Sequence, residues 1–317
     1  MRLAYQGERS KLYQADCLAW LREQPERSVH AVVTDPPYGL VEYSDEQLTK
    51  RRNGKGGVWR IPPSFGGSTR APVPRFTVLS RSQTDELYRF FRQWGETLLP
   101  VLTPGAHVMV ASTPLLSYLV NRGLADAGLE RRGEIIRLVQ TLRGGDRPKG
   151  AEEDFPTVST MPRGAWEPWV LFRRPFEGTV AANLRRWKTG GLRRPHLEQP
   201  FFDVIPSGRT PRREREVANH PSLKPQVFLR QLVRAALPFG EGIVLDPFAG
   251  SGSTLAAAEA LGYESIGVEL SDEYVDLATA AIPALSALDQ SPDQRRLERS
   301  DPLVEAAGGA TSAALAY

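Results

Sequence analysis

The sequence holds little of the chemistry that disulfide-stabilised folds and metal centres need. Its 317 residues include one cysteine, Cys17, and four histidines that lie far apart. One cysteine excludes an internal disulfide and a cysteine-based zinc cluster, and scattered histidines argue against a metal site. The sequence lacks a run of 18 apolar residues, and charges follow soon after its start, so we expect neither a membrane span nor a secretion signal. A cytoplasmic protein is therefore expected.

Apolar residues make up 41% of the chain, and their spacing alternates between the periods of strands and helices. The expected strands are 12–14, 29–34, 107–111, 133–140, 166–172, 243–246 and 265–269, and the expected helices are 17–22, 84–98, 114–127, 226–237, 253–261 and 272–281. Such alternation predicts an α/β fold, with a mostly parallel sheet and helices on both faces. Residues 42–79 lack this pattern and are expected to form a mobile loop.

Positive charge is concentrated in one stretch of the chain. The formal net charge is only +3, but residues 173–215 contain repeated arginine clusters with few acids between them. A charge run is usually a solvated face. Here Trp187, Phe201 and Phe202 are interleaved with the arginines, which favours a nucleic-acid surface.

The tetrapeptide Asp35-Pro36-Pro37-Tyr38 ends the strand expected at 29–34. Neither proline offers a backbone N–H, so two carbonyls are left beside a carboxylate without ladder partners, and an aromatic ring follows. Such a group can accept both hydrogens of an NH2 on a planar ring and stack on its face. The other interpretation is a plain turn after a strand, and the tetrapeptide alone does not decide between the two.

A second motif, residues 244–254, joins a strand to a helix through a glycine-rich turn. Its glycines allow close approach of a ligand to the backbone, and the helix then presents free N–H groups. Glu269 ends the next expected strand, at the place where an acid hydrogen-bonds a ribose in nucleoside-binding folds. A plain turn with incidental glycines is the alternative. The order of strand, Asp-Pro-Phe, Gly-x-Gly, helix, strand and acid favours a nucleoside site.

Together these motifs resemble the amino-group DNA methyltransferases that use S-adenosylmethionine. Residues 35–38 look like the family's catalytic tetrapeptide, residues 246–254 like its cofactor loop, and residues 220–225 (His-Pro-Ser-Leu-Lys-Pro) like its third signature. The catalytic motif precedes the cofactor motif, which is the permuted order of the β class. That class places its target-recognition segment before the third signature, where the arginine-rich stretch lies.

The resemblance implies a Rossmann-like methyltransferase fold with a seven-stranded sheet and a basic, irregular target-recognition segment. We expect the catalytic part at 1–172, the target-recognition segment at 173–219, the cofactor-binding part at 220–282, and a weakly ordered tail at 283–317. Because of the permutation, the strand beside the one that ends in Glu269 would be residues 12–14.

The resemblance and the charge pattern together assign site residues. The expected catalytic residues are Asp35, Pro36, Pro37 and Tyr38. The expected cofactor contacts are Asp16, Cys17, Asp35, Lys224, Asp246, Phe248, Ala249, Gly250, Ser251, Gly252, Thr254 and Glu269. The expected DNA contacts are Lys50, Arg51, Arg52, Arg185, Arg186, Trp187, Lys188, Arg193 and Arg194. For three cofactor contacts another role stays open: a helix cap for Asp16, a surface lysine rather than a partner of the cofactor carboxylate for Lys224, and a core aromatic for Phe248.

The implied reaction moves a methyl group from S-adenosylmethionine to the exocyclic amino group of a base flipped out of double-stranded DNA. Adenine N6 is favoured and cytosine N4 is the alternative, because Asp in the first position of the tetrapeptide is met more often with adenine. Transfer to cytosine C5 is rejected, since Cys17 lacks that family's preceding proline. Further alternatives are an RNA or protein amide methyltransferase and a catalytically silent DNA-binding module. A cognate restriction nuclease and a homodimer are open partners.

Overall fold

The computed structural model describes residues 1–37, 64–65, 68–69, 81–139, 145, 147–220 and 223–288. The strands are β1 (Arg2–Gln6), β2 (Ser10–Gln14), β3 (Val29–Thr34), β4 (Ser64–Phe65), β5 (Ser68–Thr69), β6 (Leu102–Ala111), β7 (Glu130–Leu138), β8 (Trp166–Arg173), β9 (Val204–Pro206), β10 (Ile243–Asp246) and β11 (Glu264–Glu269). The helices are α1 (Cys17–Arg22), α3 (Arg81–Leu98), α4 (Ser117–Asp126), α5 (Val180–Trp187), α6 (Arg212–Val217), α7 (Gln226–Ala236), α8 (Ser253–Ala260) and α9 (Asp272–Ser286).

A single large sheet organises the molecule. Within the described ranges it has nine strands in the order β1-β2-β11-β10-β3-β6-β8-β7-β9, and β4 and β5 form a separate hairpin. Only β1 and β8 run against the common direction of the others. The mostly parallel sheet is as predicted, but the predicted count of seven strands is too low. The two additional strands, β1 and β9, are short and lie at the outer edges, where alternating burial is weak.

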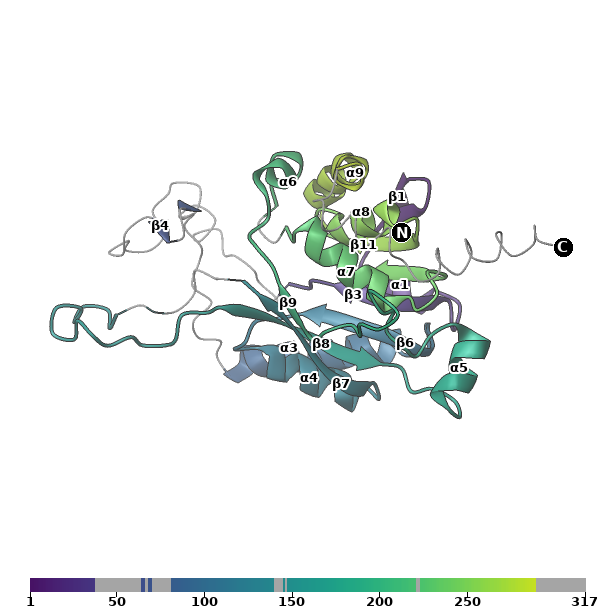
Figure 1. Ribbon diagram of the computed structural model, residues 1–317, viewed down its shortest axis with the longest axis horizontal. Coiled ribbons are helices and arrows are strands. Elements are labelled where there is room, and N and C mark those ends of the chain that lie inside the picture. Colours follow the sequence, from purple (N-terminus) through teal and green to yellow (C-terminus); the bar gives the residue numbers. More distant parts are fainter. Residues whose placement is uncertain are drawn as a thin grey trace.

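Helices cover both faces of the sheet, as the alternating pattern predicted (Figure 1). Alternate residues of each central strand point to opposite faces. Val108 and Val110 of β6 pack with α1, α3 and α4, whereas Met109 and Ala111 pack with α7 and α8. Helix α9 joins the second layer by packing against α8 and β2. No helix in the part of the chain that the structure describes is long and apolar enough to cross a membrane.

Strand β2, from the start of the chain, lies beside β11 in the sheet. Strand β2 pairs in parallel with β11, with Gln14 opposite Glu269, and Ala15 N donates to the Glu269 carbonyl at 3.0 Å. The predicted position of residues 12–14 is therefore confirmed. The parallel strands end at one edge of the sheet, which we call the carboxyl edge, and begin at the opposite amino edge. Asp35, Asp246 and Glu269 all stand at the carboxyl edge.

Two expectations about irregular segments were wrong. The segment 173–219 contains regular structure, namely α5, β9 and α6, which its interrupted pattern of charges hides. Pro283 does not begin the tail: α9 continues to Ser286, since Ile282 and Leu285 are fully buried and anchor its last turn. Residues 289–317 and most of the predicted loop 42–79 lie outside the described residues.

Candidate active site

A cavity of about 440 Å³ lies at the carboxyl edge, between the ends of β3 and β10. Ligands of open α/β sheets bind at such a position, where the chain leaves neighbouring strands in opposite directions. Most predicted site residues line it: Asp16, Cys17, Asp35, Pro37, Lys224, Asp246, Phe248, Ala249, Gly250, Ser251, Thr254 and Glu269. Tyr38 lies outside the described residues.

The glycine turn of the second motif forms one wall of the cavity. Gly250 and Gly252 have φ angles of +50° and +74°, which residues other than glycine rarely adopt. A Cβ on Gly250 would approach the His220 ring to 3.3 Å at the cavity wall, and one on Gly252 would lie 2.5 Å from Ile282 Cγ1. Gly250 therefore keeps the cavity wall open, whereas Gly252 lets α8 pack against α9.

Glu269 is held by the backbone around it. Its Oε2 accepts a hydrogen bond from Gly250 N at 2.8 Å, and its Oε1 accepts from Leu270 N and Ser271 N, each at 2.9 Å. These three donors hold the carboxylate at the cavity wall. Asp16 stands nearby at the start of α1, where Oδ1 accepts from Ala19 N at 2.9 Å. Asp16 thus caps a helix and lines the cavity at the same time.

Asp246 links the glycine turn to the strand that precedes the tetrapeptide. It is buried, and its Oδ1 accepts from Thr34 Oγ1 at 2.6 Å and from Phe248 N at 3.2 Å. Burial raises the pKa of Asp246 to about 6, although the hydrogen bonds from Thr34, Thr254 and Phe248 act in the opposite direction.

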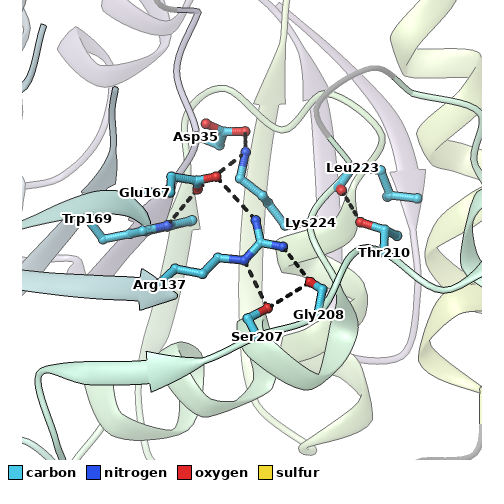
Figure 2. A network of polar contacts seen from close by, with 9 residues as sticks. All are labelled: Asp35, Arg137, Glu167, Trp169, Ser207, Gly208, Thr210, Leu223 and Lys224. Atoms are coloured by element: carbon cyan, nitrogen blue, oxygen red, sulfur yellow. Dashed lines mark hydrogen bonds and ion pairs between the residues drawn. The ribbon is translucent and has the colours of Figure 1, made fainter. Parts of the chain in front are cut away.

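Asp35, the carboxylate of the first motif, belongs to a buried network of charges (Figure 2). Lys224 Nζ donates to Asp35 Oδ2 at 2.5 Å and lies 3.6 Å from Glu167 Oε1. Burial alone would lower the pKa of Lys224, but the carboxylates of Asp35 and Glu167 outweigh burial and raise it. The expected partner of Lys224 was the cofactor carboxylate. The structure instead gives this side chain two carboxylates of the protein.

Glu167 and Arg137 are functional candidates that the sequence did not reveal. Glu167 Oε1 accepts from Trp169 Nε1 at 2.9 Å, and Glu167 Oε2 lies 3.2 Å from Arg137 Nη1. The sequence does contain a hint of Glu167, because it is a single acid within the apolar strand Trp166-Glu167-Pro168-Trp169. That pattern does not indicate which residues Glu167 contacts. Trp169 itself is both buried and part of the cavity lining.

Aromatic rings form the other walls of the cavity. Phe248 lines it and also packs against Phe90 and Trp94, with ring centroids 6.0 Å and 5.7 Å away, so both predicted roles of Phe248 are compatible. His220 and Tyr274 meet edge to face at 4.6 Å and line the cavity as well. Neither was predicted as a site residue.

Cys17 is buried at the cavity. Burial raises the pKa of its thiol to about 12, so the thiol stays protonated at neutral pH. This agrees with a reaction that needs no cysteine nucleophile.

The predicted DNA contacts do not surround this cavity. Helix α5 carries Arg185 and Arg186, and its Asn183 donates to the Pro104 carbonyl at the start of β6, which is the amino edge (Figure 1, right). The same edge holds Trp187, whose ring contacts the guanidinium of Arg27, and Lys188, Arg193 and Arg194, which lie near α5 or the end of α7. These residues therefore lie at the edge of the sheet opposite the cavity, a placement that charge runs do not reveal.

Arg193 differs from the other predicted DNA contacts in its burial. Its side chain is buried, with 8% of the residue exposed, and it donates a hydrogen bond to the Tyr263 hydroxyl. Lys50, Arg51 and Arg52 lie outside the described residues. The basic side chains next to the cavity are different ones. A second cavity of about 260 Å³, which shares His220 with the first, is lined by Arg137, Arg209 and Arg215.

The chain is similar in sequence to known DNA methylases. A family model described as DNA methylase matches residues 169–280. This range includes most of β8, the third signature and the glycine turn. These residues make the chain similar to the amino-group DNA methyltransferases. It is 22% identical to the type II methyltransferase M.HindIII of Haemophilus influenzae over 84% of this chain and 93% of that protein.

Two solved structures share the fold of this chain. The PvuII DNA methyltransferase, described as cytosine-N4-specific, matches with a TM-score of 0.59 and 15% identity over 94% of this chain and 93% of that one. The complex of M1.HpyAVI with S-adenosylmethionine matches with a TM-score of 0.54 and 15% identity over 86% and 98%. The predicted Rossmann-like methyltransferase fold is confirmed.

The residues of the cavity fit S-adenosylmethionine as the cofactor. The volume lies within the range of small-molecule sites, and the open space at Gly250 is one that a Cβ would fill. Acidic side chains from Asp16, Asp35 and Glu269 suit the ribose hydroxyls and the positive sulfur, and the Phe248 ring suits an adenine.

Proposed function

We propose that this DNA methyltransferase methylates the exocyclic amino group of a flipped base, adenine N6 in the first place and cytosine N4 as the alternative. The observation that carries the proposal is the position of Asp35: its carboxylate lines the same cavity as the glycine turn and is held there by Lys224. When bound, S-adenosylmethionine supplies the methyl group as an electrophile.

The cofactor half of the cavity is the wall formed by residues 246–254 and Glu269. We propose that Glu269, already fixed by three backbone N–H groups, takes the ribose hydroxyls. Asp16 would accept a hydrogen bond from the adenine amino group, and Phe248 would pack against the adenine ring. Ala249, Ser251 and Thr254 complete this wall.

Asp35 and the carbonyl of Pro36 would act on the target base. An exocyclic amino nitrogen is a poor nucleophile, because its lone pair is delocalised into the ring. Two acceptors placed on its hydrogens favour a pyramidal nitrogen whose lone pair points at the methyl group, so positioning and electrostatics accelerate the transfer. Asp35 or a water then takes the surplus proton. The predicted stacking of Tyr38 on the base belongs to the same proposal.

DNA would approach the carboxyl edge, where the base must enter. Arg209, Arg212, Arg213 and Arg215 are exposed near this edge and offer positive charge to phosphates. The likeness to type II methyltransferases supports a role beside a cognate restriction nuclease in a prokaryotic cytoplasm.

The test measures transfer of labelled methyl from S-adenosylmethionine to duplex DNA by the full chain and by Asp35→Ala. We expect label in DNA with the unchanged chain and at least a 100-fold lower rate with the variant, since an acceptor of the reacting amino group is lost. Nucleoside mass spectrometry of the product then distinguishes N6-methyladenine from N4-methylcytosine. Label in RNA or protein alone, with none in DNA, would contradict the proposal.

A further inference from the structure

Three charged side chains lie behind the carboxylate of Asp35 and form a network of four with it (Figure 2). Lys224 lies between the carboxylates of Asp35 and Glu167, and Arg137 lies on the far side of Glu167. The side chains of Lys224 and Arg137 are only 8% and 6% exposed, and those of Asp35 and Glu167 are 16% exposed. Two positive and two negative charges therefore balance inside the protein.

Both oxygens of Glu167 are fixed by the surrounding strands. Trp169 Nε1 donates to Oε1, and Arg137 Nη1 donates to Oε2. Arg137 is itself anchored, since its Nε donates to Ser207 Oγ at 3.0 Å and its Nη2 to the Gly208 carbonyl at 3.1 Å. The network thus runs from β9 through β7 and β8 to the end of β3.

Burying such a network is expensive. Removing charges from water costs several kcal/mol for each ion, and a hydrophobic replacement of similar volume is often no less stable. Charges of this kind therefore call for a reason other than stability, and this network ends on the carboxylate that the proposed function places against the base.

We propose that Glu167 is a positioning residue, which acts through Lys224 to hold Asp35 in its reactive orientation. The inference rests on the proposed function. Lys224 would otherwise direct its whole charge at Asp35, which would make that carboxylate a weaker acceptor for the amino hydrogens of the base. Sharing the ammonium group between Asp35 and Glu167 holds Oδ2 in place and leaves the Asp35 carboxylate free to accept the amino hydrogens of the base. Arg137 prevents Glu167 from turning away.

The discriminating variant is Glu167→Gln, measured in the full chain. Glutamine keeps the size of the side chain and an oxygen for Trp169, but it removes the negative charge. We expect kcat to fall about tenfold or more, while the Kd for S-adenosylmethionine changes less than about twofold, because Glu167 does not line the cavity.

The pH profile gives a readout that a purely structural role would not move. The carboxylates of Asp35 and Glu167 raise the pKa of Lys224, and the charge of Arg137 lowers it. Removal of the Glu167 charge is therefore expected to lower the pKa of Lys224. Deprotonated Lys224 no longer holds Asp35. The rate of Glu167→Gln is therefore expected to decline at a pH about one unit lower than that of the unchanged chain on the alkaline side.

A matched control is available at the other edge of the sheet. Glu130 of β7 pairs with the buried Arg173 at 2.7 Å, as Glu167 pairs with the buried Arg137, but it is remote from the cavity. Glu130→Gln is expected to alter stability without moving kcat or the pH profile. Glu167→Asp keeps the charge and is expected to recover part of the lost rate and the alkaline profile.

Two outcomes would overturn the inference. The first is a Glu167→Gln variant with an unchanged kcat and pH profile. The second is a variant that loses rate together with cofactor affinity, as a collapsed cavity would. If Glu167→Gln does not fold, Lys224→Arg decides: it keeps the charge at Asp35, and an alkaline decline unchanged from that of lysine would contradict the role. A chain that is unable to methylate DNA at all contradicts the proposed function itself, whereas an active chain that tolerates Glu167→Gln contradicts only this inference.

Discussion

The hydroxyl of Thr34 donates a hydrogen bond of 2.6 Å to Asp246 Oδ1, and this bond joins the ends of β3 and β10. One strand continues into the tetrapeptide that begins at Asp35 and the other into the glycine turn. Both residues are buried. The bond therefore fixes the relative position of the two halves of the cavity.

Replacing Thr34 with valine tests this bond. Valine has the shape of threonine but leaves a buried carboxylate without one of its donors, so the free energy of unfolding is expected to fall by about 2 kcal/mol at pH 8. Urea unfolding measures the loss. Thr34→Ser keeps the hydroxyl and is expected to lose less. An equal loss for both variants would assign the effect to the methyl group instead of the bond.

Asp246 makes stability depend on pH in a definite direction. Burial raises its pKa to about 6 in the folded chain, against 3.8 for an aspartate in water, so the folded state holds the proton more tightly. Protonated Asp246 therefore contributes about 3 kcal/mol to the free energy of unfolding. This contribution is fully present below pH 3.8 and is lost as the pH rises through about 6.

Asp246→Asn isolates that contribution, because asparagine keeps an oxygen for Thr34 and Phe248 but does not titrate in this range. The unchanged chain is expected to lose stability relative to Asp246→Asn between about pH 4 and pH 7. Unfolding by urea at a series of pH values measures the difference. Parallel curves for the two proteins would show that Asp246 titrates normally.

Gly252 and Gly262 form a pair that separates steric overlap from backbone strain. Their φ angles are +74° and +73°, but a Cβ on Gly252 would strike Ile282, whereas a Cβ on Gly262 has nothing within 4 Å. Gly262→Ala is expected to cost about 1 kcal/mol for the strained backbone alone. Gly252→Ala is expected to cost about 1–3 kcal/mol more, because the junction of α8 with α9 is overpacked. Equal losses in thermal unfolding would contradict this assignment.

The sequence predicted the main site because its chemistry is local. Asp35 directly follows a short apolar strand, Asp246 and Glu269 end theirs, and parallel strands bring their carboxyl ends to one edge. The placement of residues 12–14 beside the cofactor strand was also predictable, but only through the resemblance to a permuted family. Hydrophobic period alone orders strands along the chain, not across the sheet.

The parts that could not be predicted depend on contacts between distant segments. Glu167 meets Lys224 and Arg137 only because β8 is inserted antiparallel between β6 and β7. Arg185 and Arg209 belong to one arginine-rich stretch, yet β9 and the segment before it carry the chain from the amino edge back to the carboxyl edge. The distribution of charges along the sequence does not show how the chain returns to the carboxyl edge.

The path of this stretch predicts which arginines contact DNA. Arg209 and Arg215 line the cavity next to the active site, so Arg209→Ala/Arg215→Ala is expected to weaken binding of duplex DNA. Each lost phosphate contact reduces the slope of log K against log salt by about 0.9, so the slope is expected to fall by up to about two. Affinity for S-adenosylmethionine is expected to stay the same, since neither arginine lines the larger cavity.

Arg185→Ala/Arg186→Ala is the matched control, because these arginines are also exposed but lie on α5 at the amino edge. It removes the same number of charges from the same stretch of sequence. The double variant at the amino edge is expected to keep the salt slope of the unchanged chain in fluorescence anisotropy with labelled duplex DNA. If the control loses as much affinity as Arg209→Ala/Arg215→Ala, net charge governs binding and the carboxyl edge has no special role. A loss confined to Arg209→Ala/Arg215→Ala means that DNA lies across the edge where the base must reach Asp35.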